Sequence, residues 1–186
     1  MQLVFPDATK VFFTSDTHFG HANIIKYCSR PWENVEAMND GLIDNWNSKV
    51  GPTDTIFHLG DFAFGGSAFW CSLLSRLNGK IHLIVGNHDL RNLREGYMKL
   101  FESVCLEQII KVENKTIILN HCPLLCYSGD QEDVYQLYGH VHSGPNSTSR
   151  DVPKLRVLSK NQYDVGVDNN NYYPVSFAEI LAKIGK

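Results

Sequence analysis

Short apolar runs rich in β-branched and aromatic residues recur along this chain and alternate with segments of helical periodicity. This alternation is typical of βαβ units, in which helices connect parallel strands. It predicts strands over residues 10–14, 55–59 and 80–85, and helices over residues 34–50 and 67–77. The helix over residues 34–50 is the clearest, because its apolar residues share one face: Val35, Met38, Leu42, Ile43 and Trp46.

The pattern changes in the second half of the chain. Residues 104–112 and 116–120 flank Glu113-Asn114-Lys115, which predicts a hairpin with a short turn. Further strands are expected over residues 136–138 and 155–158, and a last helix over residues 176–184. Parallel units followed by hairpin-connected strands indicate an α/β fold, a four-layer α-β-β-α sandwich of two packed mixed sheets flanked by helices.

Length and composition predict a single domain over residues 1–186, because no Ser/Gly/Pro-rich stretch resembles a linker. Pro6 and Asp7 interrupt the start of the chain, and no apolar run approaches membrane-spanning length. The five irregularly spaced cysteines lack the pattern of a disulfide scaffold, and Cys122 and Cys126 are interpreted as buried apolar fillers. We therefore expect a cytoplasmic protein with reduced thiols and no membrane partner.

The formal net charge of −3 and the pI near 6.2 argue against a long nucleic acid as partner. Duplex binding relies on many Lys and Arg contacts that release counterions. A small substrate fits this charge better, and the sequence leaves the oligomeric state open.

Clusters of polar and ionisable residues follow five of the predicted strands. Their sequences are SDTHFGH, LGDFAF, VGNHDL, LNHCP and YGHVH, and Gly60, Gly86 and Gly139 are expected to let the backbone turn sharply there. Each cluster alone is ordinary loop chemistry, but the carboxyl ends of strands in α/β sheets are where sites form. Because so many polar groups in one crevice would be costly without a partner, we expect a bound metal pair with mixed N/O ligation.

The order of these motifs resembles that of the calcineurin-like metallophosphoesterases, which runs D-x-H, G-D, G-N-H-[D/E], H and G-H-x-H. The resemblance spans Asp16 to His142, and the stretches SDTHFGHANIIKYCSRPW and DVGVDNNNYYPVS are similar to a compact bacterial and phage branch. Carried over by position, it implies one metal ion at Asp16, His18 and His142, a second at Asn87, His121 and His140, and Asp61 bridging both.

The resemblance further implies a dinuclear hydrolase of small phosphoesters, nucleotides among them, with phosphodiesters slightly favoured over phosphomonoesters. Two cations about 3.5–4 Å apart turn a bridging water into the hydroxide nucleophile and clamp the phosphoryl oxygens. Manganese is the expected activating metal, with iron, zinc or nickel as alternatives. Asp61 and His88 are the expected catalytic residues, with His88 over the substrate as general acid.

One departure concerns the Ser/Thr protein phosphatases of this superfamily. They carry a second acid and then Arg where this chain has Phe64 and Gly65. Since that acid orients the catalytic His, Asp89 becomes a candidate partner of His88, its alternative role being a cap of the following segment. The missing Arg weighs against a phosphoprotein phosphatase.

Substrate contacts are expected from His21, Arg30, Asn87 and His88. His21 is equally well explained as a hydrogen-bonded loop residue, and Arg30 either neutralises a substrate phosphate or lies on the surface.

Two further groups have mainly structural interpretations. His58 and His82 lie inside predicted strands and are expected to be core histidines. Residues 169–173, Asn-Asn-Asn-Tyr-Tyr, either line a base or sugar pocket or form turns.

Two other functions are compatible with the same motifs. The double-strand-break repair nuclease shares them, but that class carries capping segments and a basic surface that this short acidic chain lacks. The retromer subunit keeps the fold as a binding scaffold, and His88 argues against this role because a scaffold has no need of a His beside the metals.

Overall fold

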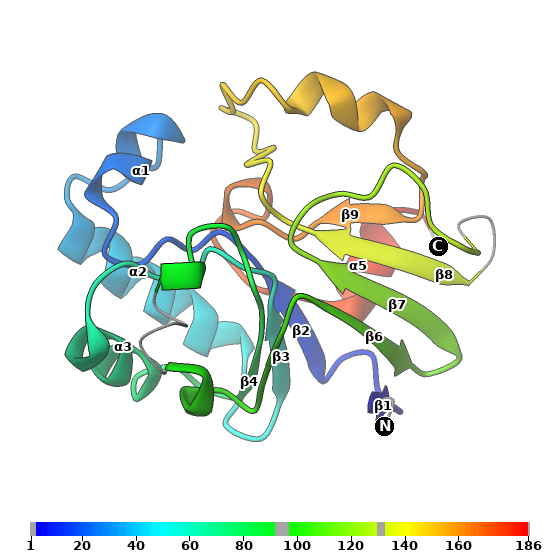
Figure 1. Cartoon of the computed structure of the whole chain (residues 1–186), viewed down its shortest axis with the longest axis horizontal. Helices are drawn as coiled ribbons and strands as arrows, with labels where there is room; N and C mark the ends of the chain where they lie inside the picture. Colours follow the sequence, from blue (N-terminus) through cyan, green and yellow to red (C-terminus); the bar gives the residue numbers. More distant parts are fainter. Residues whose placement is uncertain (1–2, 92–96, 130–132, 186) are drawn as a thin grey trace.

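The computed structural model describes residues 3–91, 97–129 and 133–185. Two five-stranded sheets pack together with helices outside them (Figure 1). The sheet here called the β2 sheet has the order β10-β2-β3-β4-β5, and its strands are Val175–Ser176, Val11–Thr14, Thr55–His58, Lys80–Ile84 and Ser103–Cys105. The second, the β7 sheet, has the order β1-β6-β7-β8-β9, and its strands are Leu3–Phe5, Glu107–Val112, Lys115–Asn120, Val134–Tyr138 and Gln162–Asp164.

Both sheets are mixed. In the β2 sheet, β2, β3, β4 and β5 run parallel and β10 pairs antiparallel with β2. In the β7 sheet, β6 and β7 form the expected antiparallel hairpin. The other pairs, β1 with β6, β7 with β8 and β8 with β9, are parallel. The carboxyl ends of β2, β3 and β4 therefore share one edge, and those of β7 and β8 share another.

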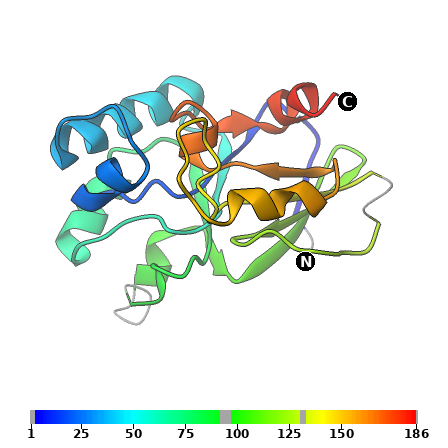
Figure 2. The same cartoon turned by 90° about the horizontal axis from the view of Figure 1, so that it is seen from above.

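The helices are α1 (Ala22–Tyr27), α2 (Val35–Lys49), α3 (Ser67–Leu74) and α5 (Phe177–Lys183), with 3-10 turns η1 (Tyr97–Leu100), η2 (Val152–Val157) and η3 (Val167–Asn169). Asn34 caps α2 by accepting from the Ala37 amide, and Ser176 with Glu179 forms a capping box on α5. Figures 1 and 2 both show α1, α2 and α3 on one side of the molecule and η2 and α5 on the other. Within the described residues, no helix combines the length and the apolar content that a bilayer crossing needs.

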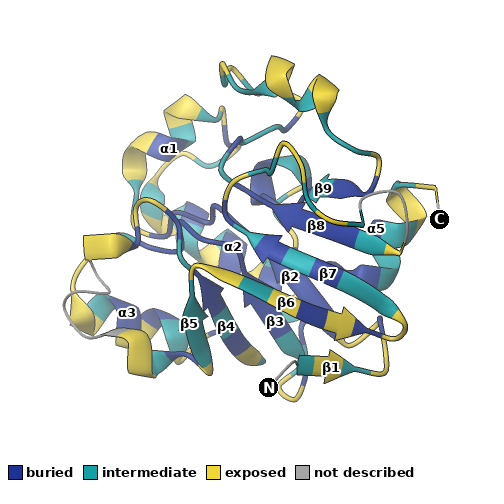
Figure 3. Cartoon of the chain, turned by 45° about the vertical axis from the view of Figure 1, so that its right-hand side comes forward, coloured by how far each residue is buried: buried dark blue, intermediate teal, exposed yellow. Residues whose placement is uncertain are grey.

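Apolar side chains fill two layers. Between the sheets, Phe13 stacks on Phe57 with ring centroids 5.8 Å apart, and both belong to a buried cluster with Ile117 and Leu137 of the β7 sheet. On the other face of the β2 sheet, a second cluster joins its strands to buried residues of α2 and α3. Figure 3 shows buried residues in the central strands and exposed ones on the outer helices, in the loops and along β6 and β1. The expected fold class, two mixed sheets flanked by helices, is confirmed.

Two sequence-based expectations about strands are wrong. Residues 155–158 are not a strand but mostly belong to η2, where Pro153 begins a helical turn, and β9 takes the place beside β8. Residues 104–112 are not one strand, because the chain leaves the β2 sheet after Cys105 and enters the β7 sheet at Glu107. The apolar run gave no sign of that crossing, which occurs at exposed Leu106.

Candidate metal centre

The loops that follow five strands converge at one place. Asp16 and His18 follow β2, Asp61 follows β3, Asn87 follows β4, His121 follows β7, and His140 and His142 follow β8. Main-chain hydrogen bonds tie the loops together, with the amides of Asp16 and His18 donating to the carbonyl oxygens of Gly60 and Asp61, each over 3.0 Å. The Gly139 amide likewise donates to the His121 carbonyl over 2.9 Å.

Five of these seven residues have left-handed backbone conformations. Their φ angles are positive, between 51° and 69°: Asp16, His18, Asp61, His140 and His142. A non-glycine residue held in this region costs on the order of 1–3 kcal/mol, and such residues cluster at functional sites. The loops are thus held in costly conformations that aim these side chains at a common centre.

The glycines next to these residues serve two different purposes. Gly60 has φ +97°, as expected for a sharp turn. For Gly86 and Gly139 the structure shows no such φ, and the reason for glycine is space. A Cβ on Gly139 would lie 2.4 Å from Oδ2 of Asp16, and one on Gly86 would lie 2.3 Å from Oδ1 of Asp61.

Asp16, His18 and His142 form the first group of potential ligands. One donor atom from each lies within 4.8 Å of the others. Oδ2 of Asp16 accepts from the His140 amide over 2.9 Å, but Oδ1 of Asp16 and Nε2 of His18 are buried without a hydrogen-bond partner among the described residues. Buried polar atoms are normally paired, so these two atoms need an explanation.

The surroundings of His18 disfavour a charge on its imidazole. Burial, together with the charge of His142, lowers the pKa of His18 well below its ordinary value. The 3.6 Å contact between Nε2 of His18 and Oδ2 of Asp61 is therefore not an ion pair of the usual kind. A neutral ring with a free nitrogen lone pair is the form in which histidine binds metals.

Asn87, His121 and His140 form the second group. Oδ1 of Asn87 lies 3.1 Å from both Nε2 of His121 and Nδ1 of His140. Nδ1 of His121 donates to the Leu59 carbonyl oxygen over 2.7 Å, since that oxygen can only accept. In the neutral ring, Nε2 of His121 is then an acceptor that faces another acceptor on Asn87, an arrangement that a cation between them would stabilise.

Asp61 connects the two groups. Its Oδ2 lies 3.6 Å from Nε2 of His18, and its Oδ1 lies 3.6 Å from Nε2 of His121. Oδ1 also accepts from the His88 amide over 2.9 Å, and burial raises the pKa of Asp61. One carboxylate thus faces a histidine from each group.

Asp89 supports this loop rather than the His88 ring. Its buried carboxylate accepts three main-chain hydrogen bonds, from Gly86 over 2.8 Å and from Asp61 and Phe62 over 2.9 Å each. Burial raises its pKa to about 6. These bonds give Asp89 a role in holding Asp61 in place instead of the expected role as partner of the His88 ring. The segment that Asp89 was expected to cap, residues 92–96, lies outside the described residues.

His88 lies at the open side of the centre. Its side chain is 47% exposed, and its Nε2 is 3.9 Å from Oδ2 of Asp61. Its ring packs against those of His18 and Phe64, with centroids 5.5 and 5.4 Å apart. Phe64 also stacks on His21 at 4.3 Å, so an aromatic ring occupies the position where protein phosphatases of this kind carry the acid.

Arg30 lies behind the centre and is neither on the surface nor available to substrate. It is buried, and its guanidinium makes two 2.9 Å hydrogen bonds to Asp168 and two more to the carbonyl oxygens of Asp16 and Thr17. Its donors therefore hold the loop that carries the first group.

Asp168 is a site residue that the sequence analysis missed. Its Oδ2 lies 2.7 Å from Nδ1 of His142. Burial opposes a charge on His142, but the carboxylates of Asp16 and Asp168 outweigh it and raise the pKa of His142 to about 11. A signal was present, because Asp168 follows the apolar run Val165-Gly166-Val167 within one of the two longer stretches that resemble the phage branch.

The remaining candidates have structural roles or different environments. Cys122 and Cys126 are exposed rather than buried fillers, and Cys122 lies within 4.8 Å of ligand atoms of His121 and His140. The side-chain amides of Asn169 and Asn170 bond to main-chain carbonyl oxygens, which makes them turn residues.

The two strand histidines were expected in the core. His58 is fully buried, and its Nε2 lies 2.9 Å from Oγ1 of Thr17. His82 is half-buried, with Nδ1 2.7 Å from Oγ of Ser103. The core assignment is thus confirmed for His58, and His82 lies at its margin.

Comparison with known proteins agrees with this architecture. The family model described as calcineurin-like phosphoesterase matches residues 9–169. The chain is 36% identical over 179 residues to the uncharacterized protein MJ1445 of Methanocaldococcus jannaschii, covering 95% of this chain and 92% of that protein. It is 29% identical over 191 residues to the gene 66 protein of Mycobacterium phage L5, covering 86% and 87% of the two chains.

A solved structure shares the fold. The crystal structure of the protein of unknown function AQ665 from Aquifex aeolicus superposes with a TM-score of 0.68 at 25% identity, covering 93% of this chain and 98% of that one. The resemblance inferred from the motif order is confirmed by these matches. This chain belongs to the calcineurin-like phosphoesterase family.

Proposed function

We propose that this chain hydrolyses small phosphoesters with two divalent metal ions, and that phosphodiesters are slightly favoured over phosphomonoesters. Membership of the family implies metal-dependent phosphoester hydrolysis. The number of ions, the residues that hold them and the substrate preference are our proposal.

One observation carries the proposal. Polar atoms of the centre are left without a fitting partner: Oδ1 of Asp16 and Nε2 of His18 have no hydrogen-bond partner among the described residues, and Oδ1 of Asn87 faces Nε2 of His121 over 3.1 Å. Leaving such atoms unsatisfied is costly, and cations would satisfy them. The donor set of imidazole nitrogens and carboxylate or amide oxygens fits divalent transition metals.

The two groups suggest where the ions bind. Asp16, His18 and His142 would hold one ion, Asn87, His121 and His140 the other, and Asp61 would contact both. When bound, two divalent ions supply an activated water and offset the charge of the phosphoryl group. Manganese is the metal we favour, with iron, zinc or nickel as alternatives.

We assign His88 the role of general acid. It is exposed on one side and lies beside Asp61 without belonging to either ligand group. From there its imidazolium can donate a proton to the departing alkoxide oxygen, while Asp16, Asp61 and the ligand histidines stay in place. His21, stacked on Phe64 next to His88, is the second candidate for a contact to the phosphate.

The test is a substrate screen combined with metal analysis. Purified protein reconstituted with Mn²⁺ should hydrolyse bis-p-nitrophenyl phosphate, p-nitrophenyl phosphate or 2′,3′-cyclic nucleotides, and elemental analysis should approach two ions per chain. Full activity with a reproducible limit of one ion would contradict the dinuclear assignment, and no hydrolysis of any of these esters would contradict the proposed function.

A further inference from the structure

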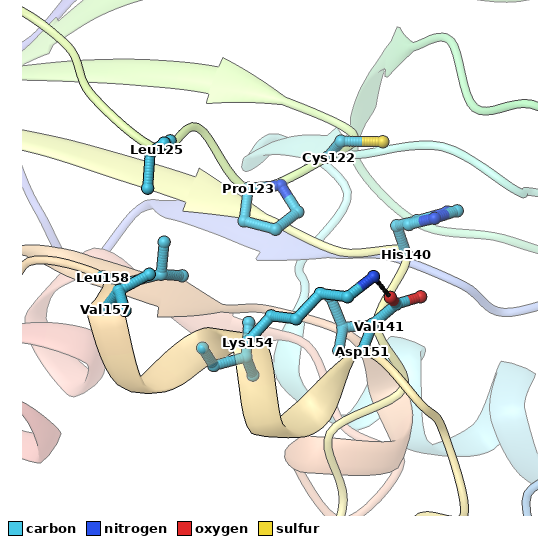
Figure 4. Close-up of a pocket in the computed structure, with 10 residues that line it drawn as sticks. Cys122, Pro123, Leu125, His140, Val141, Asp151, Lys154, Val157 and Leu158 are labelled. Atoms are coloured by element: carbon cyan, nitrogen blue, oxygen red, sulfur yellow. Dashed lines mark hydrogen bonds and ion pairs between the residues drawn. The ribbon is translucent and has the colours of Figure 1, made fainter.

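Within the described part of the chain, three cavities have a ligand-group residue in their walls, one beside His140 and two beside His142. The first, of about 320 Å³, lies between the loop after β7 and η2. Figure 4 shows His140 and Cys122 at one end of it and Leu125, Val157 and Leu158 at the other. Since His140 belongs to the second ligand group, this cavity, here called the η2 pocket, adjoins the centre.

The second cavity, of about 360 Å³, adjoins the other ligand group. His18, His88 and His142 line it on the side of the centre, and Tyr27 and Ser149 lie among its other walls. The chain between β8 and η2 contributes to both cavities, residues 147–149 to this one and residues 151–158 to the η2 pocket. A phosphoryl group at the centre would therefore have a separate cavity beside each ligand group.

The walls of the η2 pocket define what it can bind. Pro123, Leu125, Val141 and Leu155 give it an apolar lining. Its two charged residues, Asp151 and Lys154, form an ion pair with each other over 2.5 Å, so their charges offset each other (Figure 4). The volume falls at the lower end of the range of pockets for small organic ligands, about 300–1,000 Å³. An uncharged apolar or aromatic group of modest size fits these walls.

We propose that the η2 pocket binds the ester group that stays on the phosphate when a phosphodiester is cleaved, and that this group is apolar or aromatic. This inference rests on the proposed function. The leaving alcohol occupies the other cavity, because His88, the general acid, lines that one. A monoester has one organic group and fills one cavity, whereas a diester fills both.

The experiment compares two diesters that lose the same leaving group. Methyl p-nitrophenyl phosphate and phenyl p-nitrophenyl phosphate both release p-nitrophenolate, and only the retained group differs. The variant is Leu125→Glu, and the matched control is Leu106→Glu between β5 and β6, since these side chains are 76% and 70% exposed. With Mn²⁺ enzyme, we expect Leu125→Glu to lower the phenyl-to-methyl ratio of kcat/KM by about tenfold relative to wild type, because the phenyl ring loses an apolar wall. Leu106→Glu should leave the ratio unchanged.

The phenyl-to-methyl ratio of kcat/KM is compared between each variant and the wild type. The intrinsic reactivity of the two diesters and the fraction of folded protein therefore cancel. Val157→Glu, at the same end of the pocket as Leu125, is the second variant and should lower the ratio in the same direction. Hydrolysis of both diesters with an unchanged ratio in both pocket variants would overturn the pocket assignment alone. A change in molar mass by light scattering with an unchanged ratio would also overturn it, by assigning this surface to a protein contact. No hydrolysis of any ester by the wild type would instead refute the proposed function.

Discussion

Oδ2 of Asp168 lies 2.7 Å from Nδ1 of His142, although 26 residues separate them in the sequence. The same carboxylate accepts from Nε and Nη2 of Arg30, and Nη2 also donates to the Asp16 carbonyl oxygen over 2.7 Å. Asp168 therefore fixes the ring of His142 with Nε2 directed towards Oδ1 of Asp16, 3.8 Å away. A carboxylate behind a histidine ligand fixes its orientation and raises its basicity.

Replacement of Asp168 should weaken the binding of one of the two metal ions selectively. Asp168→Asn is expected to lower the affinity for the ion at the His142 group by about 10–100-fold, because the ring loses its anionic partner. The ion at Asn87, His121 and His140 should keep its affinity. Isothermal titration with Mn²⁺ measures both sites, and Asp133→Asn, at an exposed acid paired with Lys115, is the control. Equal weakening of both ions would contradict a positioning role for Asp168.

Asp61→Asn should reduce metal binding and activity more than the loss of a residue that contacts only one ion. The carboxylate faces His18 and His121 at 3.6 Å each, and an amide cannot offer two anionic oxygens. We expect metal content after dialysis to fall for both ions and kcat/KM to drop by more than about 100-fold, beyond the effect of an outer-sphere partner. His140→Ala, compared by the same elemental analysis, should lose one ion. Retention of both ions in Asp61→Asn would show that Asp61 does not bridge.

His88→Ala should separate proton transfer from metal binding. Because His88 belongs to neither ligand group, the variant is expected to keep both ions. General acid catalysis typically contributes about 10²–10⁴-fold, and p-nitrophenolate leaves without a proton. The loss in kcat/KM should therefore be much larger for alkyl or nucleoside esters than for p-nitrophenyl esters. An equal loss for both would indicate electrostatic stabilisation of the phosphoryl charge instead.

Buried His58 should make folding stability depend on pH. Burial, with a contribution from the charge of His121, lowers the pKa of His58 to about 3, below the unfolded value of about 6.5. Between these pH values His58 binds a proton more readily in the unfolded chain than in the folded one. Its effect on the free energy of unfolding is therefore absent above about pH 6.5, and stability is lost as the pH falls from there towards 3. At pH 5 the loss from this residue amounts to about 2 kcal/mol.

Urea unfolding of metal-free wild type and His58→Gln at pH 7 and pH 5 measures this effect. The difference between the two proteins isolates His58 from the histidines of the metal centre. The glutamine amide can still donate to Thr17, whose hydroxyl donates to the Phe62 carbonyl oxygen. If the free energy of unfolding changes equally with pH in both proteins, the pKa of His58 does not differ between the folded and unfolded chains.

Duplex DNA should bind weakly, and hydrolysis of small phosphoesters should depend only slightly on salt. The net charge of −3 provides few of the phosphate contacts on which duplex affinity depends. Fluorescence anisotropy with a labelled duplex at 50 and 200 mM salt tests this, with the p-nitrophenyl ester rates measured in the same buffers. Tight binding that weakens steeply with salt would favour the nuclease alternative.

The sequence predicted the ligand-bearing loops because their determinants are local. An apolar run followed by an ionisable cluster indicates a strand end, with a glycine between them in three of the five cases, and the order of the five clusters identified the family. Asp168 was missed because its role depends on Arg30, 138 residues away in the sequence. The crossing at Leu106 was missed because both sheets accept an apolar strand, so only the tertiary pairing of β5 with β4 decides where one strand ends.

Short elements escaped prediction for a related reason. Strands β1 and β9 have three residues each and α1 has six, which is too few for a periodic pattern. In residues 155–158 the apolar run alone did not distinguish a strand from a helical turn, although Pro153 favours the latter.

The two ligand groups each draw on both sheets. Asp16 and His18 extend from the β2 sheet and His142 from the β7 sheet, while Asn87 comes from the former and His121 and His140 from the latter. Neither group exists in a chain in which only one sheet has formed. An ion held by either group would thus act as a cross-link between the two halves of the sandwich, and amide hydrogen exchange should slow in both sheets together when metal binds.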